Sequence, residues 1–199
     1  MTLLLLLGLG DARAQTSSSI VFEFNPQFTS VHQNDAELEA YGFAPVGGRF
    51  TPQYGVRGVY GMASGLRMGL VASAGFSSNQ AQDNPVPTTT NWTQIGGIAG
   101  YRLHERVAAD LELGFGSLTH TVGSERSGGA LLYLGPYAQP QVNLILSEAP
   151  WAFALGVGWM LHVPVSAPHS QPLWEEEFKR GVVQGPVLSL QSGFGRVGQ

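Results

Sequence analysis

The sequence predicts an all-β fold: an antiparallel, up-and-down transmembrane β-barrel of about eight strands. Three observations predict it, namely strict side-chain alternation, unusually long strand segments, and links that alternate between short and long. Residues 151–165 show the first two best, because every odd position is large and apolar and every even position except Met160 is small or polar. Side chains alternate between the two faces of a strand. Strands in soluble domains run to about 5–6 residues, whereas a bilayer crossing takes about 9–11.

The same alternation recurs in seven further segments, each with one apolar face. The predicted strands cover residues 20–28, 53–62, 66–76, 94–103, 109–116, 132–146, 151–165 and 188–194. Pro136 and Pro140 fall inside the sixth segment, where each removes a ladder donor and marks either a bulge or a misplaced boundary.

The links between these segments alternate in length. Short links lie at residues 63–65, 104–106 and 148–150, and long polar links lie near residues 31–51, 78–91, 121–129 and 166–181. Short periplasmic turns and long extracellular loops are typical of bacterial outer-membrane barrels. Helical turns are expected within the first and last long links, at residues 36–39 and 173–180.

Composition excludes several classes of protein. Only 12% of the 199 residues are charged, against about 25% in ordinary globular chains, and Gly contributes 27 residues. The mean hydropathy is +0.04, and beyond the N-terminus no run approaches the roughly 18 apolar residues of a membrane helix. The scattered Lys and Arg form no basic stripe, so nucleic acid is not an expected partner.

The N-terminus divides from the rest of the chain. Residues 1–14 are interpreted as a signal peptide, because a leucine run is followed by Ala12-Arg13-Ala14, a small-x-small cleavage pattern. No Lys or Arg precedes the leucines, and one interpretation is an N-terminally incomplete signal. The alternative is a core segment of a soluble protein. Residues 15–199 then form the barrel domain.

Six charged residues are predicted to point into the barrel. They are Glu23, Asp110 and Glu112 together with Arg57, Arg67 and Arg102, a balanced set of three acids and three bases. An eight-stranded barrel is just wide enough to be filled by side chains. A structural network that keeps charge away from lipid is therefore favoured over a plug or gate in a narrow pore. The many inward glycines are interpreted as room for bulky Arg and Tyr side chains.

Outward-facing aromatic residues are expected near both ends of the barrel. Trp151 and Tyr101 lie close to short turns, and Trp92 and Phe76 lie close to long links. This distribution is typical of the aromatic girdles at the two membrane interfaces.

One group of residues has the composition of a catalytic site. The five histidines show no metal-ligand spacing, and neither a phosphate-binding loop nor a serine elbow is present, so no cofactor or metal is expected. His162, Ser166 and His169 are candidates for a serine–histidine hydrolase site, but His162 is predicted to face inward. An interior histidine and a solvated loop are the favoured interpretation.

These patterns together resemble the small eight-stranded outer-membrane β-barrel superfamily that includes the OmpA membrane domain, OmpX and OmpW. The resemblance covers about residues 18–199 and rests on alternation and link lengths, not on a specific motif. It implies the bacterial outer membrane as the location, with outer-membrane lipid and the outer-membrane assembly machinery as partners, and a monomeric barrel. Members commonly end in an aromatic residue, for which Phe194 is the candidate here.

The expected function is a structural or surface-interaction role, with weak passage of small solutes as a possible addition. One alternative is a lipid-modifying barrel enzyme similar to lipid A deacylases. The other is a secreted, soluble, lipocalin-like binding barrel.

Overall fold

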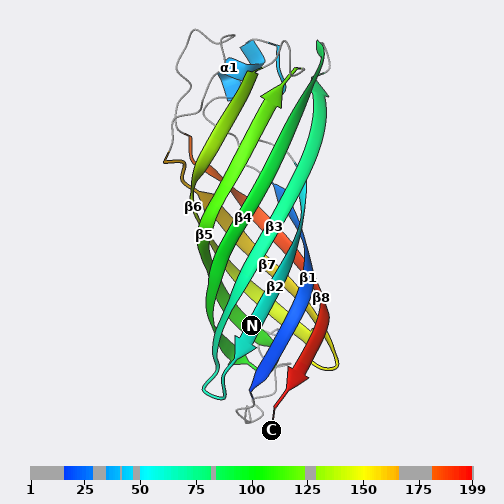
Figure 1. Cartoon of the computed structure of the whole chain (residues 1–199), viewed down its shortest axis with the longest axis vertical. Helices are drawn as coiled ribbons and strands as arrows, with labels where there is room; N and C mark the ends of the chain where they lie inside the picture. Colours follow the sequence, from blue (N-terminus) through cyan, green and yellow to red (C-terminus); the bar gives the residue numbers. More distant parts are fainter. Residues whose placement is uncertain are drawn as a thin grey trace, which may run out of the picture.

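The chain forms one closed β-barrel (Figure 1). The computed structural model describes residues 16–28, 35–40, 42–46, 50–81, 84–123, 129–165 and 181–198. Each strand pairs antiparallel with the next one in the chain, and β1 closes the barrel against β8. The elements are β1 (Ser17–Phe28), α1 (Asp35–Ala40), β2 (Phe50–Gly61), β3 (Leu66–Ala81), β4 (Asn84–His104), β5 (Val107–Val122), β6 (Gly129–Ser147), β7 (Trp151–His162) and β8 (Val183–Val197). The predicted eight-stranded, up-and-down architecture is confirmed.

The short links are confirmed, and they define one end of the barrel. They connect β2 to β3, β4 to β5 and β6 to β7, and at this same end β1 begins and β8 finishes. We call it the turn end, and the opposite end, which carries α1, the loop end (Figure 1). The predicted signal peptide, residues 1–14, lies outside the described residues.

The long link predicted near residues 78–91 is wrong. β3 continues to Ala81 and β4 starts at Asn84, and the two strands stay paired almost to the tip of this hairpin. Its Ser, Thr and Asn content is typical of loops, but here polar side chains alternate with buried ones such as Thr88, Thr90 and Trp92. Alternation with a buried face makes a polar segment a strand.

The helical turn expected at residues 36–39 is confirmed as α1, Asp35–Ala40. The second one, at residues 173–180, lies outside the described residues. Within the described part of the chain, no helix is long and apolar enough to span a membrane.

Both prolines of β6 lie inside the strand on its exposed face, and so neither marks a misplaced boundary. Pro136 and Pro140 pair with Phe115 and Leu111 of β5. On the β7 side, the ladder is interrupted between Ala138 and Gln141. This interruption follows from the missing backbone N–H of Pro140.

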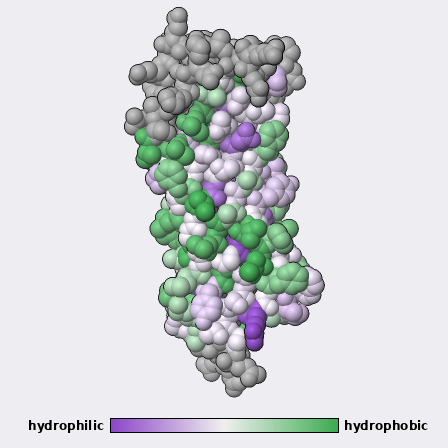
Figure 2. All heavy atoms as spheres, in the orientation of Figure 1, coloured by the Kyte–Doolittle hydropathy of each residue, from purple (hydrophilic) through white to green (hydrophobic). Residues whose placement is uncertain are grey.

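Large apolar side chains cover the outside of the barrel, as the alternation predicts. Leu70, Ile95 and Phe22 are each about two-thirds or more exposed, and Figure 2 shows hydrophobic residues around the middle of the barrel. Trp151 and Tyr101 point outward near the turn end, and Phe76 points outward higher up. The prediction for Trp92 is wrong: it is buried inside the barrel, because it lies an odd number of residues from the outward-facing Ile95.

Candidate functional site: the barrel interior

Arg57 of β2 lies at the centre of a buried charged cluster. Its Nη2 is 3.0 Å from Oε1 of Glu23 on β1 and also contacts Oε1 of Glu112 on β5. Its Nη1 lies 3.6 Å from Oδ2 of Asp110. All four side chains are essentially shielded from solvent. Charges held this way remain off the apolar outer surface, where each would be costly in lipid.

Asp110 links this cluster to a second arginine and to a chain of amides. Arg67 donates to it twice, from Nε to Oδ1 at 2.9 Å and from Nη2 to Oδ2 at 3.2 Å, which is the two-pronged geometry that suits guanidinium and carboxylate. Asn143 donates to Oδ2 at 2.9 Å, and Gln141 donates to Asn143 at 2.7 Å. Gln191 donates to the same Asn143 oxygen at 3.1 Å, which connects β6 to β8.

Arg102 lies apart from this cluster, which differs from the expected balanced set. Its Nη1 donates to Oε2 of Glu148 at 3.0 Å, and the two side chains are partly exposed at the turn end. The buried cluster therefore contains two arginines and three carboxylates. Sequence reasoning missed Glu148 because it lies in a short turn, where strand alternation assigns no face.

The inward glycines make room for bulky polar side chains, as predicted. A Cβ added to Gly96 would lie 2.5 Å from the hydroxyl oxygen of Tyr137, and one added to Gly114 would lie 2.7 Å from Cε1 of the same ring. At Gly156, a Cβ would lie 2.6 Å from Oδ1 of Asn143. Tyr137 and the chain of amide side chains thus fill space that is free only because these three positions are glycine.

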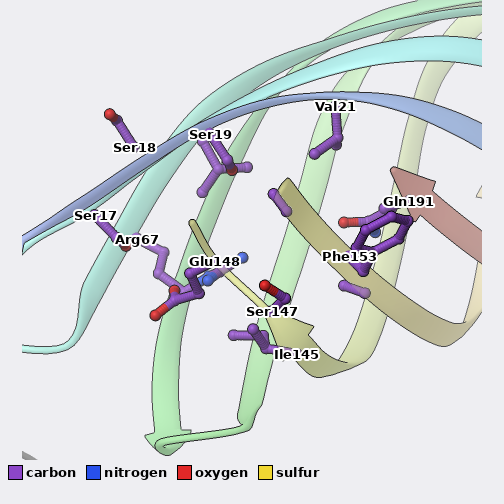
Figure 3. Close-up of a pocket in the computed structure, with 13 residues that line it drawn as sticks. Ser17, Ser18, Ser19, Val21, Arg67, Ile145, Ser147, Glu148, Phe153 and Gln191 are labelled. Carbon is purple, nitrogen blue, oxygen red and sulfur yellow. The ribbon is translucent and has the colours of Figure 1, made fainter. Parts of the chain in front are cut away.

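Little open space remains in the turn-end half of the barrel. A cavity of about 30 Å³ lies below the charged cluster, lined by Ser19, Arg67, Ser147, Glu148 and Gln191 among others (Figure 3). A volume of that size holds about one water molecule. The interior here is a packed polar core with no pore visible in the described residues.

The loop-end half of the interior contains an apolar cluster as well as buried polar residues such as Thr90 and His120. A buried cluster of strand residues meets residues from the β1–β2 connection, including Leu38 of α1 and Val46. The cluster consists of Leu38, Val46, Trp92, Leu118, Val122, Leu131, Tyr133, Met160, Val183 and Val187, with Phe43 packed against it. Leu38 is completely buried and Val46 nearly so, so α1 and residues 42–46 close this end of the barrel.

Polar contacts fix this closing segment. The backbone N–H of Val46 donates to Oδ1 of Asp35 at 2.8 Å. His120 of β5 lies 3.3 Å from the carbonyl oxygen of Ala44 through Nε2, and 2.9 Å from the Thr90 hydroxyl through Nδ1. Because a carbonyl only accepts, Nε2 carries the proton in this arrangement. Sequence reasoning did not single out His120, although its parity on β5 places it inside.

His162 is fully buried inside the barrel at the end of β7. Its Nε2 lies 3.2 Å from the carbonyl oxygen of Gly116, and its ring meets the edge of Trp92 at 5.4 Å between centroids. Ser166 and His169 lie outside the described residues. No grouping of three or more His, Cys, Asp or Glu suited to a metal ion occurs in the part of the chain that the structure describes.

Comparison with solved structures identifies small bacterial barrels of the same fold. The structure of Ail, the attachment invasion locus protein of Yersinia pestis, in complex with the heparin analogue sucrose octasulfate matches with a TM-score of 0.59 and 8% identity, over 92% of this chain and 99% of that one. A second Ail structure matches with a TM-score of 0.56 and 9% identity over the same shares. Neisserial surface protein A gives 0.48 and 10% identity, over 90% of this chain and 97% of that one.

At such low identity these matches show the fold alone, which is that of small eight-stranded outer-membrane β-barrels. No protein-family model matches the sequence, and comparison with curated protein sequences finds no match.

Proposed function

We propose that the chain is a non-enzymatic barrel of the bacterial outer membrane that acts through its loop end, in surface interaction. The observation that carries this proposal is the outer face. Among the described residues, 32 large hydrophobic side chains are exposed. Soluble monomers rarely expose contiguous apolar patches above a few hundred Å², so a continuous apolar belt favours lipid as the surrounding medium.

The packed interior supports a structural barrel over a transport pore. The charged cluster around Arg57 blocks the turn-end half, and α1 with its apolar cluster blocks the loop end. Weak passage of small solutes would require both the Arg57 cluster and α1 to move.

The segments that connect the strands at the loop end have a net negative charge, which a binding partner would meet. The connections at residues 29–49, 82–83, 123–128 and 163–182 contain eight acidic and four basic residues, while the remainder of the chain is balanced. The entire formal charge of −4 therefore belongs to these connections. Like charges repel across an interface. A partner with neutral or basic contact groups suits this end better than a polysulfated glycan of the kind bound to Ail.

The enzyme alternative finds no support in the described residues, because His162 is enclosed and already bonded to a backbone carbonyl. We propose outer-membrane lipid as the surrounding partner, insertion by the outer-membrane assembly machinery, and a monomeric barrel.

The test is fractionation of cells that express the chain. We expect it in the outer-membrane fraction, extractable only with detergent, with different gel mobility before and after boiling. Recovery as a soluble protein without detergent would overturn the proposal and favour the lipocalin-like alternative. Heparin-binding measurements on the purified barrel are expected to show no binding, and tight binding would contradict the charge argument.

The enzyme alternative has its own test. Mass spectrometry of lipid A from expressing cells should show no change in acylation. If the unchanged chain removes an acyl chain from lipid A, and neither the His162→Ala variant nor the Ser166→Ala variant does so, the protein is a lipid-modifying enzyme instead.

A further inference from the structure

Four neighbouring strands, β3 to β6, are longer than a bilayer crossing, but only on β3, β4 and β5 does the outer face become polar toward the loop end, since β6, with 19 residues, has Leu132 and Leu134 there. β3, β4 and β5 contain 16, 21 and 16 residues, whereas a bilayer crossing takes about 9–11. On their outer surface the last large apolar residues are Phe76, Ile95 and Phe115. Beyond these three, the wall of the barrel continues as paired sheet.

Apart from Pro87, the outward residues of this extension whose side chains the structure describes are polar and uncharged. They are Ser78, Thr89, Asn91, Thr93, Ser117, Thr119 and Thr121, which we call the hydroxyl face. Every one has a hydroxyl or an amide, and none is charged. Figure 2 shows the corresponding upper area over β3 to β5 as mostly white to pale purple.

Strand pairing arranges these side chains as a regular grid. Thr93 lies opposite Ser117, Asn91 opposite Thr119, and Thr89 opposite both Ser78 and Thr121. Neighbours across strands are about 4.8 Å apart, and neighbours along one strand about 6.6 Å. The hydroxyl groups of Thr93 and Ser117 bond each other at 2.7 Å.

The sheet that presents this grid is supported from inside. Trp92 and Leu118 alternate with its residues and lie buried in the apolar cluster under α1. The hydroxyl face is thus a preformed surface on a packed wall, and ligand binding would not have to pay for ordering it.

The absence of charge distinguishes this face from an ordinary water-facing strand. A well-soluble surface contains about 25–35% charged residues. The hydroxyl face contains none, and the eight acidic and four basic residues near the loop end belong to the segments that connect the strands. The hydroxyl and amide groups can donate hydrogen bonds to a phosphate as well as to a sugar, but with no Lys or Arg among them the face forms no ion pair with an anion and favours neutral, hydroxyl-rich ligands. Such chemistry belongs to carbohydrate.

We propose that the hydroxyl face binds neutral sugar residues of the outer-leaflet glycolipid, directly above the lipid that surrounds Phe76, Ile95 and Phe115. The proposal rests on the outer-membrane location proposed above. Its second support is continuity, because the face begins on the same strands where the apolar belt ends. A ligand anchored in the belt by its acyl chains would present its sugars at this height.

The test uses the full chain refolded in detergent micelles, with lipopolysaccharide that retains its core oligosaccharide and with lipid A that lacks it. The unfolding temperature is measured from the change in gel mobility on heating. The readout is the ligand concentration at which the rise in this temperature is half-maximal. We expect tighter binding of the core-bearing glycolipid than of lipid A. Thr→Val substitution at residues 89, 93, 119 and 121 together should weaken only the core-bearing ligand, by about tenfold, or about 1.4 kcal/mol.

The matched control replaces the same four threonines with serine, which keeps each hydroxyl and should keep the tighter binding. Equal binding of the two glycolipids by the unchanged chain overturns the proposal, as does a valine variant that retains the preference. A valine variant that instead dissociates a dimer, seen by sedimentation, would assign the face to contact between copies and also overturn it. Fractionation separately scores the outer-membrane location, so its failure is distinguishable from failure of sugar binding.

Discussion

Arg57 on β2 and Glu23 on the neighbouring strand β1 form an ion pair at 3.0 Å, and neither side chain reaches solvent. The same guanidinium also meets Glu112 on β5, on the opposite side of the barrel interior. One side chain therefore ties strands that share no backbone hydrogen bonds. A barrel of this width allows such a connection because its interior is spanned by single side chains.

Arg57→Met should destabilise the barrel strongly. Removing one partner of a buried ion pair costs about 3–5 kcal/mol, since it leaves uncompensated buried charge. Urea unfolding of the refolded protein in micelles measures the loss. Arg102→Met is the control, because its partly exposed pair with Glu148 should be worth no more than about 1 kcal/mol. If the two variants lose the same free energy of unfolding, the buried Arg57 cluster stabilises the barrel no more than the partly exposed Arg102–Glu148 pair does.

Gly114→Ala should be harmful where Gly97→Ala is not. A Cβ at Gly114 would lie 2.6 Å from Cα of Gly96 and 2.7 Å from the Tyr137 ring, whereas one at Gly97 meets nothing closer than 3.9 Å. Overpacking of this kind costs about 1–3 kcal/mol. The two variants are compared by the urea midpoint of the refolded barrel. A neutral Gly114→Ala would mean that the interior has more free space than a single water-sized cavity.

The purified barrel should not conduct ions. Its turn-end interior is filled by the Arg57 cluster and the amide chain, with a remaining cavity of about 30 Å³. Planar-bilayer recordings after reconstitution are expected to stay at baseline at moderate voltage. Reproducible stepwise currents from boiling-sensitive protein would establish a pore and show that the interior network opens.

Leu38→Ala should loosen the closure of the loop end. Leu38 is completely buried in the apolar cluster, and truncation of a buried leucine costs about 2–5 kcal/mol. We expect protease cleavage between β1 and β2 to accelerate at least about tenfold, since cleavage follows the population of the opened form. Glu39→Ala, on the exposed side of the same helix, is the control and should leave the rate unchanged. Identical rates in both variants would mean that α1 does not hold this segment.

Alternation was sufficient for the architecture because the period of two is a local property of an extended chain. Residues 151–165 showed it without any tertiary information, and the outward assignment of Trp151 and Tyr101 followed. Parity also predicts that Trp92 points inward, since it lies three residues from the outward-facing Ile95. The outward prediction rests on its position near a predicted loop, which does not determine the face of a strand residue. Composition misled for residues 78–91, where polar side chains belong to a strand and not to a link.

Neighbours in the chain are enough to predict eight strands and the two faces of each strand, because the period of two is a local property. Which of the inward charges meet depends on how the strands close into a barrel. Closure of the barrel brings Glu23, Arg57 and Glu112 together from three strands, and leaves Arg102 to pair with Glu148 at the turn end. Burial of Leu38 under the loop end was likewise a matter of closure, since an apolar interior exists only once all eight strands surround it.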